Sequence, residues 1–192
     1  MRLDIMPIAT VKQVIDMEQA AKHIWIDYYR DIFSPDQIQY MLKKFHSREA
    51  IEQQIQDGMI YIMLMFGNET IGYASYYLED DILQMPRLCI KKEYRRKGLA
   101  KQVIEHVELL FLSKEHGFSY VKKIQHNISV KNKTAIAIYE HLGFYKKKRV
   151  TVDFGNGYFS EDYVMEKRIK SHEERIHGTK TETIHPFASD RT

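Results

Sequence analysis

One short turn of this chain carries the residue types that can bind a phosphate group. Its residues are Arg95, Arg96, Lys97, Gly98, Leu99, Ala100 and Lys101. They follow an apolar, strand-like stretch at residues 88–90 and open a segment with helical periodicity. A strand, a basic turn and a helix N-terminus form an anion site, because free backbone N–H groups point outward there and the helix dipole favours negative charge. Gly98 leaves no Cβ between such an anion and the backbone.

Both this turn and a second one further along the chain are predicted to open amphipathic helices. In the first helix the expected buried face is Ala100, Val103, Ile104, Val107 and Phe111. The second helix follows the strand-like segment 124–130, begins at Asn132 and ends at Gly143, a suitable C′ residue. Its expected apolar face is Ala135, Ile138, Tyr139 and Leu142.

The two motifs together, R-x-x-G-x-A and then N-x-x-A-x-x-x-Y-x-x-x-G-F, resemble the GCN5-related N-acetyltransferase (GNAT) superfamily. The resemblance covers Ile60 to Ile169. It implies an α/β fold of the GNAT acyl-CoA N-acyltransferase type, with a mixed twisted sheet of about seven strands flanked by helices. It also implies an enzyme that transfers acetyl from acetyl-CoA to a primary amine by direct attack in a ternary complex, without a metal.

The same resemblance assigns the residues that bind coenzyme A. The basic turn 95–101 would hold the pyrophosphate. The backbone of Leu88, Cys89 and Ile90 would hold the pantetheine arm, with one N–H group facing the thioester oxygen as in an oxyanion hole. Relatives separate the two strands that flank the first helix. Asn132, in the same motif as Ala135, would hydrogen-bond the pantetheine, and a helix N-cap is a compatible role for it.

For the chemistry, the resemblance implies that Tyr139 protonates the departing thiolate, the alternative being a tyrosine that only packs in the core. Many relatives carry a glutamate in the strand before the basic turn, but residues 82–88 contain no carboxylate. The acidic turn 79–81 and a chain of water molecules are the alternatives to that glutamate as the group that takes a proton from the amine. The general base is left unassigned.

Aromatic and acidic side chains at the end of the first predicted helix suit a cationic acceptor. They are Trp25, Asp27, Tyr28, Tyr29 and Asp31, and core packing is the alternative explanation for them. The first part of the chain also resembles spermine/spermidine acetyltransferases, so we expect a small amine such as a polyamine. A protein or peptide amine, and a module that binds acyl-CoA as a sensor without turnover, are the competing hypotheses.

The amino-acid composition excludes several other classes of function. The chain has 192 residues with 29 basic and 26 acidic side chains, a net charge of +3 that is too even to favour nucleic acid. Cys89 is the single cysteine and is expected to be an inert thiol. With no secretion signal, and with residues 60–66 as the longest apolar run, we expect a cytoplasmic protein that does not bind membranes. A homodimer is left open.

Periodicity and turn residues predict one domain over residues 1–169 and a polar, flexible tail over 170–192. The expected element order is β–α–α–β–β–β–α–β–α–β–β, with a further helical stretch from Ser47 to Gly58. Ser34 to Gln37 is predicted to form a capping box. The basic run 146–149 is predicted to be a solvated strand edge. The spacings of the tail histidines fit no zinc pattern.

Overall fold

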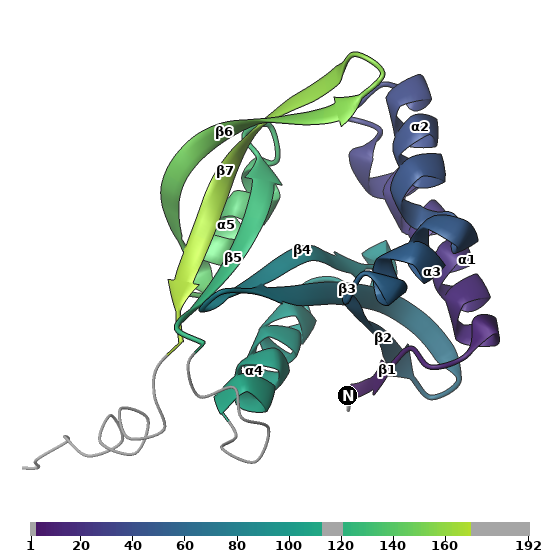
Figure 1. Ribbon diagram of the computed structural model, residues 1–192, viewed down its shortest axis with the longest axis horizontal. Coiled ribbons are helices and arrows are strands. Elements are labelled where there is room, and N and C mark those ends of the chain that lie inside the picture. The colour runs from purple at the N-terminus through teal and green to yellow at the C-terminus, as the bar shows by residue number, and fades with distance from the viewer. Residues whose placement is uncertain (1–2, 113–120, 170–192) are drawn as a thin grey trace, which may run out of the picture.

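The computed structural model of the protein describes residues 3–112 and 121–169. Within them, one mixed sheet has seven strands in the order β1-β2-β3-β4-β5-β7-β6, which confirms the predicted fold class (Figure 1). The strands are β1 (Asp4–Pro7), β2 (Ile60–Phe66), β3 (Glu69–Glu79), β4 (Ile82–Ile90), β5 (Lys123–Ser129), β6 (Tyr145–Gly155) and β7 (Tyr158–Arg168). The helices are α1 (Val11–Tyr29), α2 (Pro35–His46), α3 (Arg48–Gln56), α4 (Leu99–Leu112) and α5 (Lys133–His141), with a 3₁₀ turn η1 (Lys92–Tyr94).

Three helices connect β1 to β2, and the third, α3, confirms the helical stretch predicted from Ser47 to Gly58, which the expected element order had not counted. Ser47 separates α2 from α3, because its extended backbone ends α2 and its side chain caps α3 by accepting from the Ala50 N–H. Ser34 caps α2 as predicted, accepting from the Gln37 N–H. The reciprocal half of that capping box, a bond from the Ser34 N–H to the side-chain oxygen of Gln37, is absent from the hydrogen bonds of the described residues.

The core has a separate part on each side of the sheet. Helices α4 and α5 bury the larger cluster, which includes Val103, Ile104, Val107, Phe111 and Tyr139. Helices α1, α2 and α3 bury two smaller clusters on the opposite side. The predicted face of α5 was wrong at one position, because Ile136 is buried whereas Ile138 is 45% exposed. No helix in the described ranges is long and apolar enough to cross a membrane.

The hairpin of β6 and β7 is fixed to the rest of the sheet by a buried carboxylate. Glu166, 1% exposed, accepts hydrogen bonds from Lys147, Tyr145 and Gln125. Burial alone would raise the pKa of Glu166, but these hydrogen bonds outweigh it and lower the pKa to about 2. The side chain of Gln125 belongs to β5, so this network ties the hairpin to the strand that leads to α5.

The basic run on β6 lies at an edge of the sheet, as predicted. All four side chains are exposed, and Lys146, Lys147 and Arg149 form ion pairs with Glu140, Glu166 and Glu161. Charged side chains of this kind protect an edge strand from pairing with another chain. The predicted tail, 170–192, lies outside the described residues.

Candidate functional site

Strands β4 and β5 run side by side at one end and then separate (Figure 1). They pair in parallel only from Ile82 with Lys123 to Gln84 with Gln125. A bulge in the β3–β4 register lies directly beyond Gln84 and includes Pro86, which has no N–H group to give to a neighbouring strand. Proline at a bulge therefore ends the pairing where the strands separate. We call the region beyond Gln84 and Gln125 the β4–β5 fork.

The closed end of the fork is held by His126 of β5. Its Nδ1 bonds to the backbone oxygen of Met85, and its ring stacks on Tyr139 with centroids 4.7 Å apart and an interplanar angle of 7°. Burial lowers the pKa of His126 to about 4, although the bond to Met85 acts in the opposite direction. The imidazole is therefore neutral at pH 7. Because Nδ1 faces a carbonyl acceptor, we assign the proton to Nδ1.

Beyond the bulge, one edge of β4 has backbone groups that pair with no strand of the described residues. The Lys91 N–H donates to Ile71 on β3, and hydrogen bonding alternates along an antiparallel pair. The backbone groups of Cys89 therefore face β3, whereas those of Leu88 and Ile90 face the fork. This corrects the expectation for Cys89, whose N–H is not directed to the fork. The Ile90 oxygen already accepts from Arg95 Nε at 2.8 Å.

The basic turn has the geometry of an anion site. Gly98 has φ +72°, and a Cβ built on it would meet nothing within 4 Å. It precedes α4, and its oxygen accepts the first bond of the helix, from the Gln102 N–H. Arg96 also has a positive φ, 61°, which is strained for a residue with a side chain. The side chains of Arg96 and Lys97 are exposed beside this helix end, where their charge can reach an anion.

Arg95 does not offer its charge to the turn as predicted. Its guanidinium lies 4.6 Å above the Tyr28 ring and 3.6 Å from a carboxylate oxygen of Asp27, in addition to its bond to Ile90. The side chain therefore joins the end of β4 to α1. The same pair corrects the expectation for Asp27, because its carboxylate is compensated by Arg95 and is not free for a cationic acceptor.

Tyr139 is positioned by the end of its own helix. The Phe144 N–H donates to the backbone oxygen of Tyr139, and the Gly143 N–H donates to the backbone oxygen of Glu140. These are the two bonds of a Schellman motif, in which Gly143 has φ +88°. The ring of Phe144 packs edge-on against Tyr139 at 5.0 Å. His126 covers the other face of the tyrosine, so the direction of its hydroxyl is fixed from both sides.

The hydroxyl of Tyr139 is buried and has no hydrogen-bond partner within the described residues. Burial raises its pKa well above the ordinary value, and nearby Cys89 and Tyr28 raise it further. The phenol therefore keeps its proton throughout the neutral range. A buried polar group without a partner is costly, so this hydroxyl is suited to a ligand atom that supplies the missing bond.

Asn132 caps α5 and also touches α1. Its Oδ1 accepts from the Ala135 N–H at 3.1 Å and from the Tyr28 hydroxyl at 3.0 Å. The cap is therefore formed, and the N–H of Ala135 is used within the protein. Both acceptor bonds fall on the oxygen of Asn132, so its amide NH₂ is the group that would donate to a pantetheine carbonyl.

The predicted acceptor residues divide into three groups. Trp25 is in the core, 7% exposed, with its indole N–H bonded to Tyr73, so the structure overturns its assignment to the acceptor site. Tyr28 and Tyr29 pack edge-on at 5.1 Å and are half-buried at the end of α1. Asp31 is exposed beyond α1 and lies 3.9 Å from Arg30.

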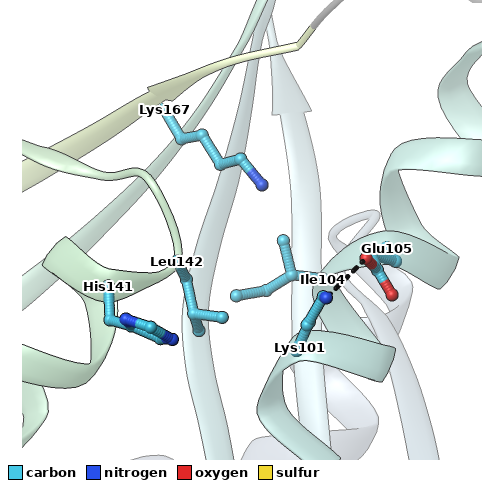
Figure 2. Close-up of a pocket in the computed structure, with 6 residues that line it drawn as sticks. All are labelled: Lys101, Ile104, Glu105, His141, Leu142 and Lys167. Carbon is cyan, nitrogen blue, oxygen red and sulfur yellow. Dashed lines mark ion pairs between the residues drawn. The ribbon is translucent and has the colours of Figure 1, made fainter. Parts of the chain in front are cut away.

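A crevice of about 150 Å³ lies between α4 and the end of α5. Figure 2 shows Lys101 directed toward Glu105 in this crevice, where the two charges are 3.8 Å apart. None of the residues that face the fork line it. The ion pair draws the ammonium of Lys101 toward the crevice, so its predicted contact with a pyrophosphate would need this pair to open.

One acidic residue near the fork was not predicted from the sequence. Asp162 of β7 is 7% exposed and lies opposite Ser129, the last paired residue of β5. It belongs to no motif, and only the register of β7 could have placed it there. Among the residues that the structure describes, no group of three or more His, Cys, Asp or Glu side chains could hold a metal ion.

Comparisons with known proteins agree with this geometry. Residues 29–160 match the acetyltransferase (GNAT) domain family. An N-alpha-acetyltransferase of Saccharolobus solfataricus is 26% identical over 131 residues, which make up 62% of this chain and 75% of the relative. The fold is similar to that of PaiA N-acetyltransferase from Thermoplasma acidophilum in complex with coenzyme A, with TM-score 0.68, 18% identity, and coverage of 88% and 99% of the two chains. An acetyltransferase from Thermus thermophilus has TM-score 0.61 at 18% identity, with coverage of 88% and 97%.

Proposed function

The chain belongs to the acetyltransferase (GNAT) domain family, and on that basis we propose that it acetylates the primary amine of a small cationic acceptor at the β4–β5 fork. It is an N-acetyltransferase, and acetyl-CoA is its co-substrate. The location is carried by the buried hydroxyl of Tyr139, which has no hydrogen-bond partner in the described part of the chain, and by the strand edges of the fork, which are not paired there either.

The chain's own groups fit coenzyme A along the fork. Free N–H groups in the first turn of α4, with Arg96 and Lys97 beside them, would bind the pyrophosphate. The backbone edge at Leu88 and Ile90 would pair with the pantetheine as an added strand does. An N–H group of this edge that does not pair with the pantetheine would face the thioester oxygen and stabilise negative charge there.

Acetyl transfer follows from this placement. The amine nitrogen attacks the thioester carbonyl carbon, so that a C–N bond forms and the C–S bond breaks. Tyr139 gives its proton to the departing sulfur and is reprotonated by a proton that leaves the nitrogen. A phenol of pKa ~10 donating to a thiolate of pKa ~8.5 is uphill by about 2 kcal/mol. The burial of Tyr139 adds to this cost and the fixed geometry at the fork would offset it.

The β6–β7 hairpin and α2 contact each other at one side of the fork, which we call the acceptor side, and these contacts support a slender acceptor. Phe154 in the β6–β7 hairpin accepts hydrogen bonds on its backbone oxygen from Tyr40 at 3.0 Å and Lys44 at 2.7 Å, both from α2. Its ring also packs against Phe33 before α2. Because the hairpin and the helix hold each other, a polypeptide cannot lie across this side without breaking these contacts. A small amine or a chain end can enter between them.

A protein N-terminal amine is the second candidate. It is favoured by the similarity to the N-alpha-acetyltransferase of Saccharolobus solfataricus. A polypeptide chain end is as slender as a small amine, so the contacts of Phe154 allow either acceptor to enter. The two candidate functions are therefore distinguished only by measuring which acceptors are acetylated.

Ionic strength should distinguish the two acceptor classes. A doubly charged amine is attracted over a longer range, so its KM should rise with salt, whereas KM for a peptide with neutral side chains should barely move. Asp31→Asn should raise KM for the diamine and leave kcat nearly unchanged, the pattern of lost uniform binding. The measurement is thiol release from acetyl-CoA with spermidine, a monoamine of equal length and peptides.

Thiol release with a peptide and none with spermidine would overturn the small-amine proposal in favour of a protein N-terminus. A salt-independent KM for spermidine would remove the electrostatic part of the argument.

A further inference from the structure

The carboxyl group of Asp162 is buried without a counter-ion. It is 7% exposed, accepts one hydrogen bond from the Ser160 hydroxyl at 2.5 Å, and forms no ion pair with any described residue. Two other buried carboxylates of the chain do have a cation, since Glu166 pairs with Lys147 and Glu108 with Lys167. Burying an ionised carboxylate without a counter-ion costs free energy of folding. Such groups therefore occur mainly at functional sites.

The place of Asp162 in the sheet brings it to the acceptor side of the fork. It lies opposite Ser129, where β5 ends and the fork is open, and opposite Val150 of β6. Burial is the main cause of the raised pKa of Tyr29, and electrostatic interactions with Cys89, Tyr28, Tyr139 and Asp162 raise it further. These groups therefore lie around one tyrosine, with the carboxylate and the hydroxyl of Tyr139 both among them.

Among the residues that the structure describes, no group forms an ion pair with Asp162 from the elements around it. From α1 the titratable group is Tyr29, a phenol that is uncharged at pH 7 and whose pKa burial raises further. From β6, Lys148 lies on the same face at the next pair, and its exposed side chain forms no ion pair with Asp162. On β5, Ser129 carries no charge. Within the described residues this carboxylate therefore has no cation of its own, and the ammonium group of a ligand could supply one.

We propose that Asp162 is a catalytic residue, which binds the ammonium group of the acceptor and takes a proton from it. This inference rests on the proposed function and supplies its missing base. One proton passes from the ammonium nitrogen to a carboxylate oxygen of Asp162, which frees the lone pair that attacks the thioester carbon. The amine loses two protons in all. One replaces the proton that Tyr139 gives to the sulfur, and the other is released to solvent from Asp162.

A structural cost accompanies this role. Burial raises the pKa of Asp162, while the Ser160 hydroxyl acts in the opposite direction. A carboxyl group whose pKa is raised by folding destabilises the folded state at pH values above its unfolded pKa. Asp162→Asn keeps the shape and the bond from Ser160 and removes the buried charge. Its Tm at pH 7 should therefore equal or exceed that of the wild type.

The test compares Asp162→Asn with Glu161→Gln, an exposed neighbour on the opposite face of β7 that loses the same charge. For Asp162→Asn we expect kcat/KM at pH 7 to fall by about 10² to 10⁴-fold, with unchanged acetyl-CoA affinity by calorimetry. The deficit should narrow as pH rises toward the amine pKa of ~10.4, because the amine then arrives without its proton. Glu161→Gln should follow the wild-type profile. An equal kcat/KM at pH 7, or the same deficit at every pH, would overturn the proposal.

Ser160→Ala provides a second variant that keeps the carboxyl group. Loss of the Ser160 hydrogen bond removes a stabilisation of the ionised form, so the pKa of Asp162 should rise further. The acid limb of the kcat/KM profile should shift to higher pH. A limb that does not move would count against Asp162 as the group that titrates. If instead the wild type releases thiol with no amine at all, the proposed function itself fails, a result that the variants cannot mimic.

Discussion

Gly98→Asp should abolish the binding of acetyl-CoA while the protein remains folded. The added carboxylate would occupy the open space before α4 and place a negative charge where the pyrophosphate needs free N–H groups. We expect affinity to fall at least about a hundredfold, equivalent to ~3 kcal/mol. The measurement is the acetyl-CoA-dependent rise in Tm, supported by calorimetry.

Gly98→Asn is the matched control for this experiment. Gly98 has φ +72°, so both substitutions introduce a side chain in the left-handed region and should lower the Tm of the free protein by a similar amount. Only the aspartate adds charge, so Gly98→Asn should bind acetyl-CoA more tightly than Gly98→Asp. Wild-type affinity in Gly98→Asp would place the pyrophosphate elsewhere.

Tyr139→Phe should separate catalysis from stability. The hydroxyl has no partner among the described residues, and the substitution keeps the ring between His126 and Phe144. Removing an unsatisfied buried hydroxyl should leave the Tm unchanged or slightly raised. Because the same hydroxyl is proposed to protonate the sulfur, we expect the rate of acetyl transfer to fall by about 10² to 10⁴-fold.

The control for this variant is Tyr76→Phe, which removes a hydroxyl from a buried tyrosine of the same core cluster. It should leave the rate of transfer unchanged. Single-turnover measurements are needed, because slow product release could hide a change in the chemical step. A wild-type single-turnover rate in Tyr139→Phe would remove Tyr139 from the mechanism.

The parts of the site that were predictable from the sequence are those that a local segment determines. The turn before α4 and the cap at Asn132 depend on residues within one helical turn, and the Schellman motif that positions Tyr139 depends on Gly143 and Phe144. The bulge at Pro86 also had a local signal, since proline within a predicted strand indicates a bulge or an edge. That signal predicts where β4 separates from β5.

The parts that could not be predicted depend on distant segments. In the sequence, Arg95 is indistinguishable from the other positive charges of the turn. Its contacts with Asp27 and the Tyr28 ring form only because α1 packs beside the end of β4. The sequence predicts that Trp25 binds the acceptor, whereas the packing of α1 buries this side chain in the core. Asp162 is one acid in an alternating strand, and its burial beside the fork follows from the order β5-β7-β6, which pairs it with Ser129.

The central claim is that this chain transfers acetyl from acetyl-CoA to an amine at the β4–β5 fork. It is tested most directly by thiol release from acetyl-CoA across a panel of amines and peptides, with the acetylated product identified by mass spectrometry. We predict release that requires an acceptor, matches the acetylated amine one for one, and is lost in both Gly98→Asp and Tyr139→Phe. Tight binding of acetyl-CoA without thiol release for any acceptor would contradict the account and identify a module that senses acyl-CoA without turnover.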